Sequence, residues 1–217
     1  MSETLKLRNR LVVSYLTVRK IIGVLGVALP FVLIAGGFLL GNDEVESSLS
    51  LYYHTIMRDV FVGMLFAIGL GLLTYAGYDK HDNHVSNLAC LLAMGVALFP
   101  TDPGDETTST VGMLHLIFAG GFFFTLIYFA YFLFTKTAPN QQPTPQKVYR
   151  NRVYVTCAIV MLACILAIGG YYLLPEATAA QIKSYDPVFY LEAIAVVAFG
   201  ISWLTKGESI FKDVTAA

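Results

Sequence analysis

Long runs of apolar residues dominate the chain, and the polar positions gather in the short segments between them. A helix needs about 20 consecutive apolar residues to cross the roughly 30 Å hydrocarbon layer of a membrane. Six stretches approach or exceed this length, and we expect each to form a membrane-crossing helix. They cover about residues 21–40, 60–78, 85–100, 107–135, 153–175 and 187–205. The pattern therefore predicts an all-α polytopic membrane protein, a single domain over residues 1–217 built as a bundle of six transmembrane helices.

The composition supports this interpretation. Of the 217 residues 56% are hydrophobic and 13% are charged, and the mean hydropathy is +0.65. A soluble domain carries roughly 25% charged residues. The net charge of −1 provides no positive field that would attract nucleic acid. The sequence thus argues against a soluble domain and against nucleic acid as a partner, and membrane lipids are the expected partners.

The basic residues predict an orientation. When the six spans alternate in direction, twelve of the fourteen Lys and Arg residues fall on one side, and only Arg58 and Lys183 fall on the other. Short cytoplasmic segments carry the excess of basic residues in membrane proteins. We therefore expect both termini in the cytoplasm (N-in/C-in) and the protein in a bacterial inner (plasma) membrane. Residues 136–152, which contain three prolines, are expected to form a cytoplasmic linker between two three-span halves.

Ionisable side chains gather near the outer ends of the second, fourth and sixth spans. With the second helix starting near residue 50, Arg58 and Asp59 would lie about 10 Å inside its outer end, and His54 one turn above Arg58. Such groups are costly within a membrane unless they serve a function or are paired. Three helix N-termini at this end favour an anionic ligand. The candidate residues are His54, Arg58, Asp59, His115 and Glu192, with Tyr53 and Asp102 beside them.

Each candidate also has a structural interpretation. Arg58 could extend its side chain to the lipid headgroups, and His115 could form a hydrogen bond between helices. Glu192 could pair with Arg58, and Tyr53 could belong to the aromatic belt of the membrane interface. The agreement in depth among these residues favours an outward-facing polar pocket that binds a lipid headgroup or another anionic ligand.

One resemblance covers about residues 45–135. It is carried by Ser50-Leu-Tyr-Tyr-His54-Thr-Ile-Met-Arg58-Asp59, by Asp82-Asn83, by Val96-Ala-Leu-Phe-Pro100-Thr101 and by His115. These motifs resemble a family of uncharacterised small bacterial membrane proteins, which is distantly similar to six-span DRAM-like proteins. The resemblance implies the six-span fold and brings almost no established chemistry.

A second resemblance concerns chemistry. Ser50-x3-His54 with Asp59 nearby is similar to the alkaline ceramidase and adiponectin-receptor (CREST) superfamily of intramembrane zinc hydrolases. The resemblance implies zinc as cofactor, His54 as a metal ligand, Asp59 as general base and Ser50 in an auxiliary role. That superfamily has seven spans and a late HxxxH pair, which this chain lacks. His115 and Glu192 would have to replace the pair, so His54, His115 and Asp59 form the candidate metal set.

The residues leave several functions open. The first is a lipid-modifying hydrolase that uses His54, Asp59 and His115, with zinc or by acid–base catalysis. The second is a non-catalytic module that binds a headgroup or a partner through Arg58. A proton-coupled transporter with Asp59 or Glu192 as its proton site is a third, although the apolar inner halves of the spans offer no polar path.

Overall fold

The structure is a computed structural model that describes residues 3–41, 44–75, 77, 79–103, 109–137 and 142–211, with side chains from residue 15 onward. Its regular elements are all helical, which confirms the predicted all-α class. In chain order they are α1 (Glu3–Leu40), the 3₁₀ helix η1 (Ser50–His54), α2 (Arg58–Leu73), α3 (Lys80–Leu98), α4 (Thr110–Tyr128), the π-helical segment η2 (Phe129–Leu133), α5 (Pro145–Tyr172), α6 (Glu176–Lys183) and α7 (Pro187–Lys206).

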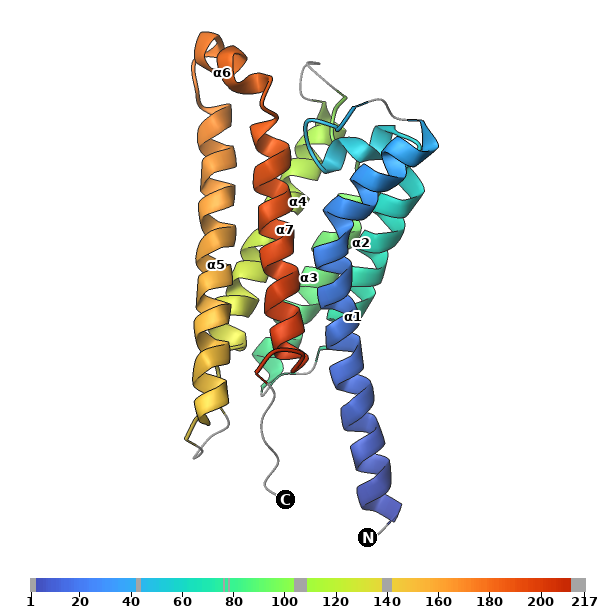
Figure 1. The fold of residues 1–217 in the computed structure, drawn as a ribbon, viewed down its shortest axis with the longest axis vertical. Coiled ribbons are helices and arrows are strands. Elements are labelled where there is room, and N and C mark those ends of the chain that lie inside the picture. The colour runs from blue at the N-terminus through green and yellow to red at the C-terminus, as the bar shows by residue number, and fades with distance from the viewer. Residues whose placement is uncertain are drawn as a thin grey trace.

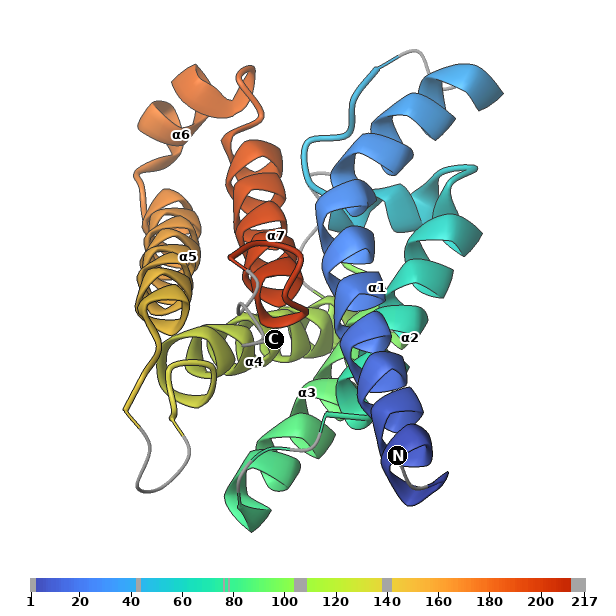
Figure 2. The ribbon, with the colours of Figure 1, turned by 60° about the horizontal axis from the view of Figure 1, so that its bottom comes forward.

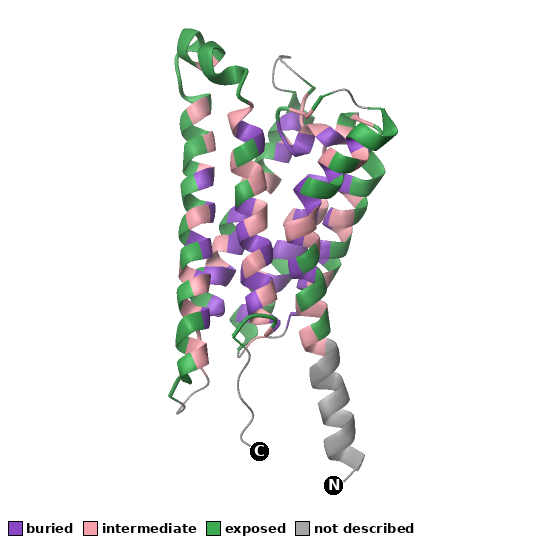
Figure 3. Ribbon diagram, in the orientation of Figure 1, coloured by how far each residue is buried: buried purple, intermediate pink, exposed green. Residues whose placement is uncertain are grey.

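Six long helices form a closed ring. Each packs on the next along the chain, α5 packs on α7, and α7 closes the ring on α1. Helices α1, α3 and α5 run in one direction and α2, α4 and α7 in the other (Figures 1 and 2). The end that carries η1 and α6 is named here the upper end, and the end where α7 finishes and α5 begins is the lower end (Figure 1). Helix α6 has no buried residue and lies on the outside of the upper end (Figure 3).

Four segments are long and apolar enough to cross a membrane: Tyr15–Leu40, Thr110–Leu133, Pro145–Tyr172 and Pro187–Lys206. They correspond to the first, fourth, fifth and sixth predicted spans. The second and third predicted spans differ for physical reasons. Helix α2 has only 16 residues because it ends at Leu73. Helix α3 begins with the polar turn Lys80–Asn83, which lowers its hydropathy.

Two predicted boundaries are wrong. The predicted linker 136–152 is helical from Pro145 onward, because Thr144 caps α5 by accepting a hydrogen bond from Lys147 N–H and proline is favoured at a first helical position. The second helix does not run on from residue 50. Thr55 adopts an extended conformation after η1, its hydroxyl bonds to Tyr52 O and Met57 N–H, and α2 starts only at Arg58.

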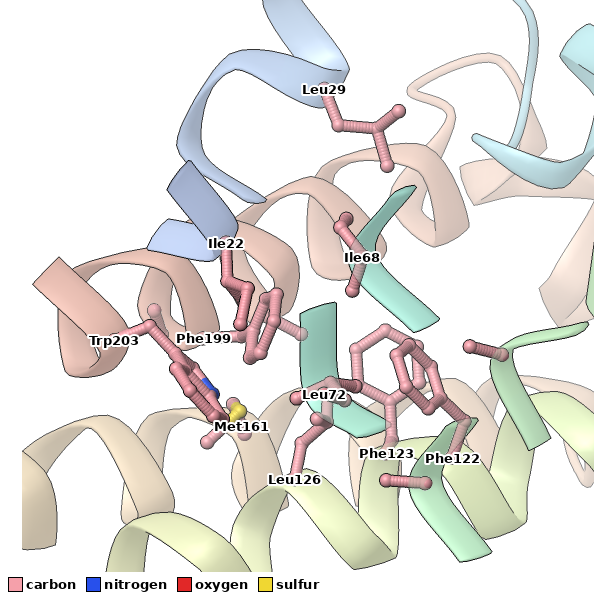
Figure 4. Close-up of a cluster of buried hydrophobic side chains, with 14 of the residues drawn as sticks. Ile22, Leu29, Ile68, Leu72, Phe122, Phe123, Leu126, Met161, Phe199 and Trp203 are labelled. Carbon is pink, nitrogen blue, oxygen red and sulfur yellow. The ribbon is translucent and has the colours of Figure 1, made fainter. Parts of the chain in front are cut away.

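The core continues through the whole ring. Figure 4 shows Ile68 and Leu72 of α2 facing Phe122, Phe123 and Leu126 of α4, while Met161, Phe199 and Trp203 lie beside Ile22. Toward the lower end an aromatic cluster follows, in which Trp203 contacts Tyr75, Phe129 and Phe134 with ring centroids 5.1–5.7 Å apart. These large side chains fix the lower ends of α2, α4 and α7 relative to one another.

The π-helical segment η2 interrupts the α-helical pattern at the end of α4. Phe134 N–H bonds to Phe129 O, five residues earlier, at 2.8 Å. The extra residue in this turn brings two pairs of side chains into the core, because Phe129, Ala130, Leu133 and Phe134 are all 0% exposed.

Candidate functional site

At the upper end, a buried histidine anchors η1. His115, 2% exposed and in the second turn of α4, has Nδ1 2.7 Å from Phe99 O and Nε2 2.9 Å from Ser50 Oγ. A carbonyl oxygen can only accept, so Nδ1 carries a hydrogen and donates it to Phe99. In the neutral ring, Nε2 then accepts the hydroxyl hydrogen of Ser50. The imidazole therefore connects η1, α4 and the end of α3 with both nitrogens in use.

A carboxylate anchors the residue directly before this 3₁₀ helix. Glu192 Oε2, in the second turn of α7, accepts a hydrogen bond from Leu49 N–H at 2.7 Å. Glu192 and Ser50 also border a small pocket of about 40 Å³ whose other walls are apolar side chains. A space of this volume is large enough for one water molecule. His115 and Glu192, which the sequence places at one depth, thus both converge on η1.

The other candidates lie apart from this pair. His54 Nε2 is 2.7 Å from Thr101 O, and Arg58 donates to Tyr53 Oη at 2.8 Å with its guanidinium carbon 4.4 Å from the Tyr53 ring centre. Because the chain breaks at Thr55, His54 and Arg58 are not one turn apart on one helix. Arg58 and Asp59 are in the first turn of α2 and exposed, so the expected depth of about 10 Å is wrong for both.

The metal expectation gains no support from the side-chain positions. Within the described residues there is no group of three or more His, Cys, Asp or Glu side chains that could hold a metal ion. His54 and His115 face separate carbonyl oxygens, of Thr101 and Phe99. The residues present do not fit a three-ligand zinc centre in this arrangement, and no zinc-dependent step is assigned to them.

A cleft of about 440 Å³ opens beside η1 at the upper end. Its volume falls in the range of small-molecule sites, about 300–1,000 Å³. The segment before η1 and the start of α4 form one wall, and the α5–α6–α7 turn forms the other. The polar lining residues are Ser47, Ser48, Thr101, Asp102, Tyr171, Tyr172, Lys183 and Asp186.

The cleft presents both signs of charge. Asp102 accepts hydrogen bonds from Ser109 N–H at 2.9 Å and Ser109 Oγ at 2.5 Å. These two bonds hold the pKa of the Asp102 carboxyl below its ordinary value, so this wall stays negative at neutral pH. Lys183, in the last turn of α6, and Asp186, at φ 46° before α7, face the cleft from the other wall.

Sequence reasoning found part of this arrangement. Asp102 was a candidate, and the structure places it in the cleft; Ser50 was singled out, and it bonds to His115. Lys183 and Asp186 were missed as site residues, although Lys183 is one of only two basic residues on the predicted outer side. Tyr171 and Tyr172 were missed because an aromatic pair at a helix end is typical of any membrane interface.

Comparison with protein-family models, with curated proteins and with solved structures found no match for this chain.

Proposed function

We propose that this chain is a six-span membrane protein, N-in/C-in, whose cleft faces outward and binds a lipid headgroup. Six antiparallel helices arranged in a ring support the span number, since α2 and α3 pack between α1 and α4, which are both long and apolar enough to cross a membrane. The basic residues support the orientation, because the lower end carries Arg19, Lys80, Lys136, Lys147 and Lys206.

The cleft itself carries the proposal. It lies at the outer end of apolar helices, where headgroups are found, and it brings the ammonium of Lys183 and the carboxylates of Asp102 and Asp186 into one lining. A ligand with one sign of charge would complement only part of this lining. A zwitterionic headgroup complements the positive and the negative side chains together, with its phosphate at Lys183 and its amine at Asp102.

The binding test uses purified protein and short-chain phosphatidylethanolamine as the probe. Lys183→Gln and Asp102→Asn should each weaken binding by about tenfold, the effect of losing one charge-assisted contact of about 1.5 kcal/mol. Arg58→Gln is the matched control, since Arg58 is the other basic residue of this side and lies outside the cleft lining. Loss of binding in Arg58→Gln alone would contradict headgroup binding in the cleft. It would support the binding site at Arg58 that the sequence predicted.

The topology test uses single cysteines in a chain without Cys90, Cys157 and Cys164. A cysteine at Tyr185, exposed at the upper end, should react in intact cells with a membrane-impermeant maleimide. A cysteine at Ser209, exposed at the lower end, should react only after the cells are opened. The reverse pattern would invert the proposed orientation.

One observation favours a second candidate function, an ester hydrolase. The Phe99 carbonyl orients His115, whose Nε2 accepts from Ser50, which is the arrangement of an orienting group, a general base and a nucleophile. In that reaction His115 takes the Ser50 proton as Oγ adds to the ester carbonyl. The alcohol leaves with that proton, and water then cleaves the acyl-serine. A fluorophosphonate probe should label the parent and Ser47→Ala but not Ser50→Ala; an unlabelled parent would remove this candidate.

A further inference from the structure

A long groove follows the outer face of α7. Helices α1 and α5 both pack on α7, one on each side of it (Figures 1 and 2). Side chains of all three helices line an open groove of about 710 Å³, which is named here the α7 groove. Along α7 the lining extends from Phe189 to Ile201, a rise of about 18 Å. One leaflet is half of the roughly 30 Å hydrocarbon layer, so the groove has about the length of a single leaflet.

The lining of the α7 groove is largely hydrocarbon. Ala193, Val197 and Ala198 contribute small side chains from α7, while Phe31 of α1 and Val160 of α5 line the groove from the flanking helices. Phe31 is 60% exposed, so a large apolar side chain stays uncovered here. Burial of such surface is favourable, and the groove therefore suits an apolar chain.

A cation lies at the part of the groove nearest the lower end. Of the described residues that line the groove, Arg152 alone is charged. Its guanidinium carbon is 5.6 Å from the ring centre of Tyr149, which is one turn closer to the start of α5 and thus to the lower end. The Arg152 side chain is exposed, and among the described residues this ring is the partner of its guanidinium. Its five N–H donors are therefore available to a ligand.

We propose that the α7 groove binds an anionic phospholipid of the lower leaflet, with an acyl chain along α7 and the phosphate at Arg152. Guanidinium groups bind phosphate through paired hydrogen bonds. A zwitterionic headgroup would bring its own cation to a lining that offers no carboxylate among the described residues, so a lipid with net negative charge fits better.

The choice of leaflet rests on the membrane orientation proposed above. In that orientation the lower leaflet is the cytoplasmic one, where anionic lipids are abundant. The α7 groove reaches Arg152 near the lower end, whereas the cleft opens at the upper end. The inference therefore does not depend on headgroup binding in the cleft.

The charge test measures lipid retention by native mass spectrometry of the full chain in detergent. Phosphatidylglycerol and phosphatidylcholine with the same acyl chains are added in equal amounts, and the parent should retain phosphatidylglycerol preferentially. Arg152→Gln should lower that preference about tenfold, the effect of losing one charge-assisted contact. Lys80→Gln is the matched control, since Lys80 is exposed at the same end and lies outside the groove lining.

The acyl-chain test fills the groove. Ala193→Phe adds a ring to the lining and should reduce retention of both lipids, whereas Ala167→Phe, at an exposed position of α5 outside the lining, should not. The unfolding temperature in lipid-free detergent shows whether each variant folds like the parent. Ile194→Ala, which removes an exposed lining side chain without adding volume, should also reduce retention of both lipids and serves where Ala193→Phe lowers that temperature.

Three results would overturn the proposal. The first is a parent without preference for phosphatidylglycerol, and the second is an equal loss of preference in Lys80→Gln and Arg152→Gln. The third is a parent dimer that Ala193→Phe converts to a monomer, since a second copy would then cover the groove. Lys183→Gln separates the groove from the cleft: it should leave phosphatidylglycerol retention unchanged, and a loss there would place this lipid in the cleft instead.

Discussion

Gly23 of α1 and Gly200 of α7 bring the two helix backbones into direct contact. A Cβ atom at Gly200 would lie 2.7 Å from Gly23 O and 2.5 Å from Val27 N. Small residues of this kind allow the close packing by which membrane helices associate. The contact closes the ring of helices, so the bundle depends on it.

Gly200→Ala should therefore destabilise the protein by about 1–3 kcal/mol, because the helices must separate to admit the methyl group. Gly63→Ala is the control, since a Cβ there meets nothing within 4 Å. That substitution should be neutral or stabilising by up to about 1 kcal/mol through helix propensity. Unfolding in a denaturing detergent series measures both, and equal stabilities would contradict the close contact.

The Ser50–His115 hydrogen bond predicts a second effect. Ser50→Ala leaves His115 Nε2 buried without its donor and should cost about 1–3 kcal/mol. Combining Ser50→Ala with His115→Phe should cost less than the sum of the two single changes, because the double variant leaves no unpaired nitrogen. Ser47→Ala, at an exposed neighbouring serine, should change little. Additive losses would show that the two side chains do not interact.

A lower-end ion pair predicts a dependence on pH. Asp82 is 0% exposed and bonds to Lys136, which also contacts Asp79 at 3.1 Å. The hydrogen bond to Asp82 raises the pKa of Lys136, and the Asp82 N–H together with Lys136 lowers the pKa of Asp79. Lys136→Met should cost about 2 kcal/mol by removing the cation that binds the buried Asp82 carboxylate, less than for a fully buried pair because the Lys136 side chain is 31% exposed.

The raised pKa of Lys136 and the lowered pKa of Asp79 define the pH range in which the cost of Lys136→Met is constant. The lysine contribution is complete below its unfolded pKa of about 10.4 and is lost as pH rises through the raised folded pKa. The Asp79 contribution is complete above about 3.9 and is lost as pH falls through the lowered folded pKa. Unfolding of parent and Lys136→Met should thus differ by a constant amount from about pH 5 to 9. Lys80 is an exposed lysine between Asp79 and Asp82 at the start of α3. Lys80→Met should therefore have the same free energy of unfolding as the parent over this pH range.

Ser109 predicts a link between stability and the cleft. Its hydroxyl accepts from Gly112 N–H at 3.0 Å and caps α4, and it also donates to Asp102. Ser109→Ala should cost about 0.5–2 kcal/mol through loss of the cap. The same change should return the pKa of Asp102 toward its ordinary value, so that headgroup binding weakens at a higher pH than in the parent. Ser109→Thr should preserve both properties, and a loss in that variant would count against the hydroxyl.

The sequence predicted the helices better than their ends. Apolar runs locate six helices because burial and membrane crossing both require them. The break at Thr55 was missed because no proline or glycine marks it; the interruption comes from hydrogen bonds that the Thr55 hydroxyl makes with its neighbours.

The sequence also predicted the positions of some site residues but not their hydrogen-bond partners. His115 and Glu192 were located at one end from helix position alone, and both contact η1. Their partners, Ser50 Oγ and Leu49 N–H, depend on where the chain turns after α1. Lys147 and Lys206 were counted in the sequence only as cytoplasmic charges. Their contacts with the backbone carbonyl and the ring of Phe134 depend on how α5 and α7 pack against the end of α4, which residue spacing does not encode.

The π-helical turn at Phe129–Leu133 makes the register of α4 sensitive to single-residue insertion or deletion. Removing one residue there would restore a continuous α-helix and rotate everything beyond it by about 100°. Lys136, which follows directly, would then turn away from Asp82, and the backbone carbonyl of Phe134 would turn away from Lys147. One extra residue in this turn therefore sets the alignment on which the Lys136–Asp82 ion pair and the Lys147–Phe134 hydrogen bond both depend, so a length change here should be poorly tolerated.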